Sequence, residues 1–387
     1  MALRVGFNAT PLAAPLTGIG NYIVHLGAAL ASSGEVDLYS FYGSRWAHDA
    51  PFPASGSARA SLVRQMRDRA KPWIPFKRQL RLARQRVTFG RGVKRHRIEL
   101  YHEPNYVALP SDVPSVTTIH DLSWLRFPET HPPDRVRWLE RAMPATLSRV
   151  AAIVVDSEFV RNEVLSVFGV EASRIHVVPL GVAGVFQPRA PGATATSLHA
   201  LGLAHGRYLL TVGTIEPRKN MGHVLDAYAN LPSRLRARYP LVVAGECGWR
   251  AKTLERELRA LSRRGEIRFL GRVDNDDLPF LYAGATAFVF PSLYEGFGLP
   301  PLEAMASGVP VLVSDRASMP EVAGGAAMLI DPAQPERTTA SLEALLEDAG
   351  RRAAMAERGL HRAATFTWEA CAARTLDVYR AVLHATK

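Results

Sequence analysis

The chain has 387 residues, of which 47% are apolar, and its formal net charge is +11. At roughly 100–200 residues per domain this length suggests two domains, and the composition excludes disordered, collagen-like and disulfide-rich miniprotein classes. The charge is uneven: residues 59–97 contain fourteen Lys and Arg against one acid, Asp68, so this segment carries +13 and the rest of the chain −2. We therefore expect a nearly neutral globule with one strongly basic segment.

The two cysteines, Cys247 and Cys371, lie far apart in the sequence without a metal-site spacing. A disulfide framework and a zinc site are therefore not expected. The first residues lack the charged and apolar regions of a signal peptide, and no apolar run reaches about 18 residues. These features predict a cytoplasmic protein that does not span a membrane.

Short apolar runs bounded by turn residues recur along the chain, with helical stretches between them. This alternation is typical of parallel strands that crossover helices bury on both faces. A first set comprises Leu3–Asn8, Val36–Phe41, Glu99–His102, Val116–His120, Ala152–Asp156 and Ile175–Val178, and a second comprises Tyr208–Val212, Pro240–Ala244, Ile267–Leu270, Thr286–Phe290, Val309–Val313 and Met328–Ile330. Two such arrays predict an α/β protein with two Rossmann-like domains that face each other across a cleft.

A stretch rich in Pro and Gly, Phe186–Gly192, separates the two arrays and is interpreted as a linker. We assign residues 1–187 to the first domain, 188–205 to the linker, 206–365 to the second domain and 366–387 to a terminal helix. Thr367 is suited to cap that helix. One helical stripe of apolar residues predicts packing against a domain; it comprises Ala372, Leu376, Tyr379 and Leu383.

Ligands of open α/β sheets bind beyond the carboxyl ends of the strands, so polar residues there are candidate contacts. After the first strand, Gly18 and Gly20 precede an apolar helix and would let backbone amides approach an anion; an ordinary strand-to-helix turn is the alternative. His120 ends the strand that starts at Val116 and is suited to bind a sugar hydroxyl or transfer a proton, unless it only staples its loop to Asp121. Asp156-Ser157 reads first as a helix N-cap and second as a ligand contact.

In the second array, Arg218 and Lys219 lie between a strand end and a helix start. Two adjacent cations there suit a diphosphate, since Arg can bond two oxygens and Lys adds a point charge. The alternative is a solvated basic turn.

A further strand leads into glycines, two prolines suited to open a helix, and two carboxylates, Glu295 and Glu303, separated by seven residues. Glu295 is expected in the loop and Glu303 near the first turn of the helix, where each would address a different part of one elongated ligand. Carboxylates accept hydrogen bonds from vicinal hydroxyls such as those of a ribose or hexose. A solvated loop glutamate and a favourable charge at a helix start are the alternative.

These residues resemble retaining glycosyltransferase family 4, whose hallmark is a Glu, seven residues and a second Glu. The resemblance also includes the loop with Gly18 and Gly20, His120, Pro179–Val182, Arg218-Lys219 and Ser318–Val322, and so covers nearly the whole chain. It implies the GT-B fold, with two Rossmann-like domains and a C-terminal helix that returns to the first domain.

The resemblance also implies roles for individual residues. Glu303 looks like the residue that holds the nucleotide ribose, and Glu295 like the one that contacts the donor sugar. The amides of Gly296, Phe297, Gly298 and Leu299 would bind sugar and phosphate, while Arg218 and Lys219 would stabilise the departing diphosphate. Gly18 or Gly20 would reach the diphosphate from the first domain, and His120 would touch the sugar. No metal ion is expected.

Many members carry Arg where this chain has Thr214, so phosphate binding would depend on Arg218 and Lys219. Similarity to bacterial mannosyltransferases of surface polysaccharide synthesis favours GDP-mannose as donor, with GDP-rhamnose or a UDP-hexose as alternatives. Retention of anomeric configuration is likewise implied by the family alone.

In the basic segment, aromatic and aliphatic side chains interleave with the cations, and Pro72 and Pro75 divide it into two helical pieces. At about 1 kcal/mol per cation near an anionic leaflet, residues 59–97 would hold the protein on the inner face of a membrane, next to a polyprenyl-diphosphate-linked glycan acceptor. A soluble basic face or a disordered loop is the alternative.

Two other function classes are a nucleic-acid binding protein, which the confined charge disfavours, and a non-catalytic sugar-nucleotide binding protein.

Overall fold

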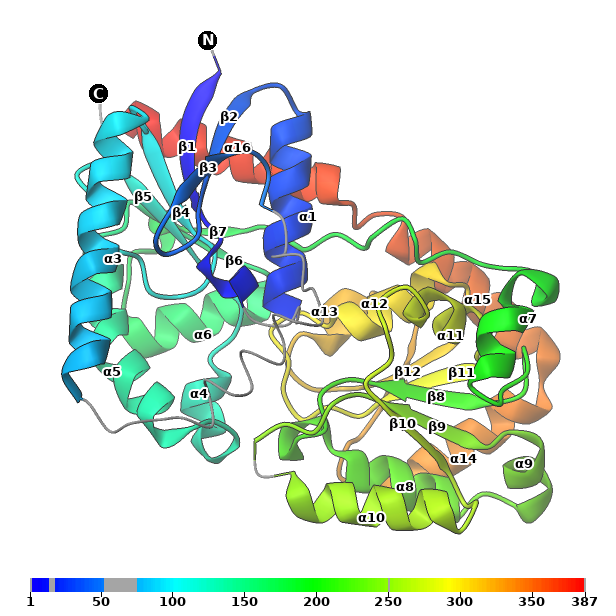
Figure 1. Cartoon of the computed structure of the whole chain (residues 1–387). Helices are drawn as coiled ribbons and strands as arrows, with labels where there is room; N and C mark the ends of the chain where they lie inside the picture. Colours follow the sequence, from blue (N-terminus) through cyan, green and yellow to red (C-terminus); the bar gives the residue numbers. More distant parts are fainter. Residues whose placement is uncertain (1, 14–17, 52–74, 250, 386–387) are drawn as a thin grey trace.

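The computed structural model describes residues 2–13, 18–51, 75–249 and 251–385, and it consists of two α/β domains (Figure 1). The first sheet contains β1 (Leu3–Asn8), β2 (Val36–Phe41), β3 (Trp46–His48), β4 (Leu100–Glu103), β5 (Ser115–Ile119), β6 (Ala152–Val155) and β7 (Ile175–Val177). The second contains β8 (Leu209–Val212), β9 (Leu241–Ala244), β10 (Arg268–Gly271), β11 (Ala287–Phe290), β12 (Val311–Ser314) and β13 (Met328–Ile330).

Helices connect most successive strands and cover the sheets (Figure 1), whereas β2 and β3, and β4 and β5, are joined without one. The first domain carries α1 (Gly18–Ser32), α3 (Pro75–Arg95), α4 (Ser123–Arg126), α5 (Pro133–Leu147) and α6 (Glu158–Phe168). The rest of the chain carries α7 (Pro191–Ala200), α8 (Met221–Ala229), α9 (Ser233–Arg238), α10 (Lys252–Arg263), α11 (Leu278–Ala283), α12 (Leu299–Ala306), α13 (Met319–Ala323), α14 (Pro335–Glu347), α15 (Ala349–Ala363) and α16 (Trp368–Ala385). Short 3₁₀ turns lie at Thr10–Ala13, Pro128–Thr130, Ala172–Arg174 and Pro217–Lys219.

The strand order is β3-β2-β1-β4-β5-β6-β7 in the first sheet and β10-β9-β8-β11-β12-β13 in the second. The pairings are parallel, with the register Val5↔Leu100 between β1 and β4, except that β3 runs antiparallel to β2. Strands such as β6, β9 and β11 are buried at every residue, as parallel strands covered on both faces must be. This arrangement confirms the predicted pair of Rossmann-like domains.

The strand β3 was not predicted. Its three residues lie at the sheet edge and are half-buried or exposed, so they do not form the apolar run that identified the other strands. The segment 188–205, interpreted as a linker, contains the helix α7, which packs against α11.

The terminal helix α16 lies against α1 of the first domain (Figure 1). The Thr367 hydroxyl accepts a hydrogen bond from the amide of Ala370 at 3.1 Å, as expected of a cap. The predicted apolar stripe faces inward, with Tyr379 fully buried. Phe366 and Trp368 belong to an apolar core that continues from the first sheet into the second domain, so α16 fastens the two domains together.

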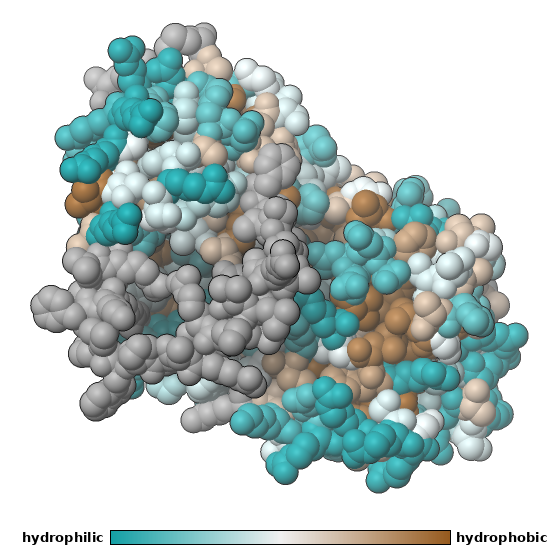
Figure 2. All heavy atoms as spheres, viewed as in Figure 1, coloured by the Kyte–Doolittle hydropathy of each residue, from teal (hydrophilic) through white to brown (hydrophobic). Residues whose placement is uncertain are grey.

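The helix α3 begins at Pro75 and includes the second part of the basic segment. The expected first helical piece, before Pro75, lies outside the described residues. Phe89 is buried against the first domain, whereas Val87 is 52% exposed. On the face drawn in Figure 2, hydrophilic atoms cover α10 and hydrophobic atoms gather over the second domain around α11 and α12.

Candidate functional site

The two candidate loops of the second domain meet at the point where the strand order of its sheet reverses. The strands β8 and β11 are neighbours there, and chain connections leave them toward opposite sides. Arg218 and Lys219 follow β8, and Glu295 follows β11. The Arg218 carbonyl accepts a hydrogen bond from the Leu293 amide at 2.8 Å, so the loops are joined directly. Such a crevice is where open α/β sheets bind ligands.

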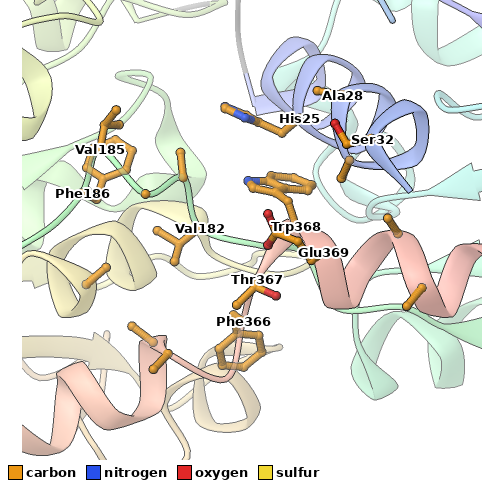
Figure 3. Close-up of a pocket in the computed structure, with 18 of the residues that line it drawn as sticks. His25, Ala28, Ser32, Val182, Val185, Phe186, Phe366, Thr367, Trp368 and Glu369 are labelled. Atoms are coloured by element: carbon orange, nitrogen blue, oxygen red, sulfur yellow. The ribbon is translucent and has the colours of Figure 1, made fainter. Parts of the chain in front are cut away.

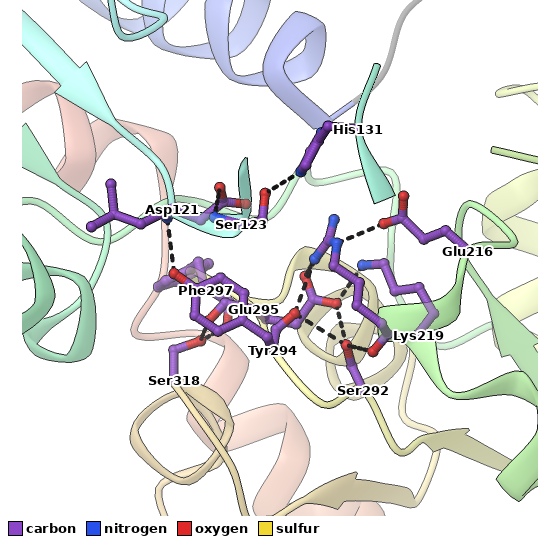
Figure 4. Close-up of polar contacts among 12 residues, drawn as sticks. Asp121, Ser123, His131, Glu216, Lys219, Ser292, Tyr294, Glu295, Phe297 and Ser318 are labelled. Carbon is purple, nitrogen blue, oxygen red and sulfur yellow. Dashed lines mark hydrogen bonds and ion pairs between the residues drawn. The ribbon is translucent and has the colours of Figure 1, made fainter. Parts of the chain in front are cut away.

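Arg218, Lys219 and Glu295 form one buried ion-pair cluster (Figure 4). Lys219 Nζ pairs with Glu295 Oε1, and Arg218 Nη1 lies 3.2 Å from Glu295 Oε2. The Ser292 hydroxyl donates to Glu295 Oε1 at 2.7 Å. Arg218 Nε is also 2.7 Å from Glu216 Oε1. Lys219 Nζ lies 5.0 Å from the centroid of the Phe290 ring, a cation–π contact.

The charges in this cluster perturb one another. Burial alone would raise the pKa of Glu295, but the charges of Lys219 and Arg218 hold it below its ordinary value. Burial lowers the pKa of Lys219 despite the neighbouring Glu295. Both cations therefore already face a carboxylate, and an anion that bound them would compete with Glu295.

Asp121 of the first domain faces this cluster (Figure 4). Its Oδ1 accepts hydrogen bonds from the Tyr106 hydroxyl at 2.8 Å and the Ser123 amide at 2.9 Å. Although burial opposes it, the charge of Arg218 helps to hold the pKa of Asp121 below its ordinary value. Asp121 was not predicted as a site residue, and neither was Glu216. The available signal was adjacency, since each lies within two residues of a predicted site residue.

Both ring nitrogens of His120 are occupied within the first domain. Nδ1 lies 2.8 Å from Asp156 Oδ2, and Nε2 lies 3.0 Å from the Pro104 carbonyl oxygen. Burial lowers the pKa of His120, but Asp156 outweighs it and the pKa is raised. Two acceptors around the ring favour its protonated form. The partner is Asp156 rather than Asp121, and contact of either nitrogen with a sugar requires displacing one acceptor.

The polar residues predicted as a cap after β6 behave as expected. The Ser157 hydroxyl oxygen accepts a hydrogen bond from the Val160 amide at 3.2 Å and is the N-cap of α6. The same hydroxyl donates to the Gly296 carbonyl at 2.6 Å, so it also joins the two domains.

Gly296 and Gly298 occupy positions where no larger residue fits. A Cβ on Gly296 would lie 1.7 Å from the His120 carbonyl oxygen, because the domains touch there. Gly298 has φ +113° and caps α12, whose second and third residues are Pro300 and Pro301, as predicted. Within the described part of the chain, no acceptor is recorded for the amides of residues 296–299. These amides are available to an anion at the start of α12.

Glu303 lies in the second turn of α12, beside Tyr282 of α11. Burial raises the pKa of Glu303 to about 7. Gly18 and Gly20 lie in the first turn of α1, and a Cβ on Gly18 would meet no atom of the described chain within 4 Å. Thr214 is exposed. The predicted contacts of these residues with a donor stay predictions.

A second polar cluster lies where the strand order of the first sheet reverses, between β1 and β4. The Glu103 carboxylate accepts hydrogen bonds from the Asn8 side chain at 2.6 Å and from the Tyr101 hydroxyl at 2.7 Å. Glu103 is 2% exposed, and burial raises its pKa to about 7. This carboxyl was not among the predicted site residues.

A separate hollow of about 810 Å³ lies between α1, residues 182–186 and the start of α16 (Figure 3). His25 and Trp368 stack there with ring centroids 5.2 Å apart. Among the described residues that line it, none is a predicted site residue. The hollow lies where the chain crosses between the domains, and so belongs to the domain junction.

Within the described ranges, no three His, Cys, Asp or Glu side chains are grouped to hold a metal ion. The helices of the same ranges include none with the length and apolar character needed to cross a bilayer.

Comparisons with known proteins agree with this geometry. Residues 16–183 match the profile of Glycosyltransferase Family 4, and residues 202–362 match that of Glycosyl transferases group 1. The chain is 37% identical over 384 residues to O-antigen chain mannosyltransferase B of Escherichia coli, covering 98% of this chain and 100% of that protein. It is 32% identical over 296 residues to the serotype-specific mannosyltransferase WbdA of Escherichia coli, covering 74% of this chain and 36% of that protein.

Solved structures show the same fold at low sequence identity. Sucrose-phosphate synthase of Thermosynechococcus elongatus superposes with a TM-score of 0.74 at 20% identity, covering 99% of this chain and 100% of that one. The HepE protein of Anabaena in complex with UDP and glucose superposes with a TM-score of 0.71 at 16% identity, covering 98% and 100%.

Proposed function

Since the chain belongs to the family 4 glycosyltransferases of the GT-B fold, we propose that it transfers mannose from GDP-mannose to a growing surface polysaccharide. The observation that carries this proposal is the buried cluster of Arg218, Lys219 and Glu295 beside the amides of residues 296–299, for which the described residues supply no acceptor. Cations and a helix start together suit the diphosphate of a nucleotide sugar. The choice of mannose follows the O-antigen mannosyltransferase of Escherichia coli, which aligns over its whole length.

In the proposed reaction, the bond between the sugar C1 and the diphosphate oxygen breaks, and the acceptor hydroxyl oxygen bonds to C1. The hydroxyl proton passes to the departing diphosphate. Arg218 and Lys219 stabilise the charge that develops on that leaving group, the task that most often dominates such catalysis. Attack from the face that the diphosphate leaves retains the configuration at C1. Because the two cations and the amides serve the diphosphate, the reaction proceeds without a metal ion.

The remaining predicted contacts complete the donor site. Glu295 accepts hydroxyls of the sugar after the diphosphate has displaced it from the cations. Glu303 holds the ribose, for which its position in α12 is suitable. Gly18 or Gly20 approaches the diphosphate from the first domain, and His120 contributes to the sugar contact.

A panel of labelled nucleotide sugars tests the donor. Purified enzyme should release mannose or transfer it from GDP-mannose in preference to GDP-rhamnose, UDP-glucose and UDP-galactose. A UDP-hexose is the second candidate, because the HepE structure of the same fold contains UDP and glucose. A clear preference for UDP-glucose would refute the mannose assignment. Absence of both transfer and donor hydrolysis would instead favour a sugar-nucleotide binding protein.

We also propose that the acceptor is a polyprenyl-diphosphate-linked glycan at the cytoplasmic face of the membrane. The described part of α3 exposes Arg84, Arg86, Arg91, Lys94 and Arg95, next to the exposed Val87. In Figure 2, hydrophilic atoms lie over the C-terminal part of α3. Cations with an apolar neighbour suit an anionic leaflet, at about 1 kcal/mol for each cation close to the surface.

Vesicle flotation tests this docking. The enzyme should float with vesicles that contain anionic lipid and not with neutral ones. Arg84→Glu combined with Arg91→Glu should reduce flotation about 100-fold or more, because each change reverses a charge. The matched control, Arg256→Glu with Arg263→Glu on the exposed face of α10, makes the same change of charge in the second domain. Equal loss in both variants would show that net charge, and not α3, controls binding.

A further inference from the structure

The residue before Glu295 reaches out of its own domain. Tyr294 belongs to the loop between β11 and α12, yet its side chain lies against the first domain and is 5% exposed. Its ring contacts Phe127 and Phe159 of the first domain, at centroid distances of 5.6 Å and 5.7 Å. Its hydroxyl is bonded on both sides, to Leu122 and to Glu163.

The directions of these hydrogen bonds follow from the groups involved. The Leu122 amide donates to the Tyr294 hydroxyl oxygen at 2.8 Å, so the single hydroxyl proton is free to be donated to Glu163 Oε2. Arg126 Nε donates to the other oxygen of Glu163 at 2.6 Å. Leu122 is fully buried and Glu163 is 8% exposed. Every donor in this bridge therefore has an acceptor. Removing the hydroxyl takes away the acceptor of the Leu122 amide and the donor to Glu163 Oε2, both of which are buried.

The bridge connects the two halves of the candidate site. Leu122 directly follows Asp121, and Tyr294 directly precedes Glu295. The carbonyl oxygen of Tyr294 also accepts a hydrogen bond from Arg218 Nη1 at 2.9 Å. The same residue thus holds Arg218 through its backbone and the first domain through its side chain.

The other neighbour of Glu295 is held as well. The Gly296 carbonyl accepts the Ser157 hydroxyl, and its backbone lies against the His120 carbonyl. Glu295 is therefore the middle residue of three, and the residues on both sides of it are attached to the first domain. A carboxylate held in this way has a fixed position relative to any acceptor bound there.

We propose that Tyr294 is a positioning residue for glycosyl transfer, whose hydroxyl bridge aligns Glu295 and Arg218 with the acceptor side of the cleft. This rests on the glycosyl transfer proposed above. The bridge acts mainly after donor binding, because most of the predicted donor contacts, including Arg218, Lys219 and the amides of residues 296–299, lie within the second domain. Its loss lowers kcat for transfer and leaves the KM for the donor unchanged.

Tyr294→Phe tests the proposal, since it deletes the hydroxyl and keeps the aromatic packing. We expect kcat with GDP-mannose and acceptor to fall roughly 10- to 100-fold, the range for a misplaced reacting group. The donor KM should stay within about twofold, and hydrogen exchange at the Leu122 amide should accelerate about tenfold. Tyr208→Phe is the matched control: it deletes another buried hydroxyl, which donates to the Leu281 carbonyl within the second domain.

A second variant separates position from stability. Adding Glu163→Gln to Tyr294→Phe replaces the buried carboxylate, whose Oε2 has lost its donor, by a neutral amide, so the melting temperature should recover at least in part while kcat stays low. Recovery of both, a kcat equal to that of Tyr208→Phe, or unchanged Leu122 exchange overturns the proposal. The donor assignment is judged on the wild-type enzyme alone, and the variants are compared with whichever donor it uses.

Discussion

Replacing Lys219 by methionine separates the electrostatic role of this residue from its structural one. Methionine retains most of the length of lysine without its charge. The pair that Lys219 forms with Glu295 is almost buried, with side chains 12% and 10% exposed. If the ammonium group stabilises the departing diphosphate, its loss removes about 3–4 kcal/mol of transition-state stabilisation, comparable with an oxyanion-hole donor. The turnover number should therefore fall about 100- to 1000-fold.

Stability should respond less strongly than turnover. Breaking a buried ion pair costs about 3–5 kcal/mol when the remaining charge has no other partner. Glu295 would keep Arg218 at 3.2 Å and Ser292 at 2.7 Å, so we expect a cost of about 2 kcal/mol, below that range. Adding Glu295→Gln removes the buried anion and should restore much of the loss.

The assay therefore measures melting temperature and turnover at saturating donor in Lys219→Met and in Lys219→Met/Glu295→Gln. The double variant should be more stable than the single variant and no more active. Near-normal turnover of Lys219→Met would refute the diphosphate role. A double variant less stable than the single one would refute the electrostatic explanation of its instability.

Three further predictions concern other parts of the molecule. The raised pKa of Glu103, about 7 against an unfolded value near 4.5, means that the unfolded chain ionises first as pH rises, so stability falls by up to about 3 kcal/mol across this window. In urea titrations at pH 5 and pH 8, Glu103→Gln should reduce the fall in stability by this amount and leave the part due to Glu303, whose pKa is also raised to about 7, whereas Glu140→Gln, at an exposed position, should leave the whole fall unchanged. Gly296→Ala should abolish transfer and enlarge the radius of gyration in solution scattering, because its Cβ would lie 1.7 Å from the His120 carbonyl oxygen; unchanged scattering would contradict this. Transfer should be equally fast with EDTA and with added Mg²⁺, and a requirement for Mg²⁺ would exclude the metal-free mechanism.

The sequence predicted the two sheets because parallel strands carry their own signal. A strand such as β11 is buried on both faces and is apolar throughout, so it is visible without its neighbours. The short edge strand β3 has no such run and was missed. The helix start at Pro300 and Pro301 was predicted for the same local reason, since proline suits the first turn.

The candidate site was predictable only in part. Arg218, Lys219 and Glu295 were found because strand ends of one parallel sheet meet at one edge. The partner of His120, which is Asp156, was not predicted. Asp121 and Asp156 both follow strand ends, and the sequence does not show which of them the ring faces. The bridge from Tyr294 to Glu163 joins residues 131 positions apart in different domains. Such a contact depends on how the domains pack, which no local pattern contains.

The helices α6 and α12 both begin at the contact between the domains, but the amides at their first residues have different hydrogen-bond partners. This difference bears on where an anion would bind. At α6, the Ser157 side chain accepts the Val160 amide, and the Glu321 carboxylate accepts the amides of Glu158 at 3.0 Å and Phe159 at 3.2 Å. Glu321 comes from the second domain, so contact between the domains itself fills this anion site. At α12, no recorded acceptor within the described residues takes the amides of residues 296–299. A helix start attracts one anion most strongly where its amides are unpaired. This difference supports the proposed place of the donor diphosphate at α12, beside Arg218 and Lys219, while the Glu321 carboxylate joins the second domain to α6.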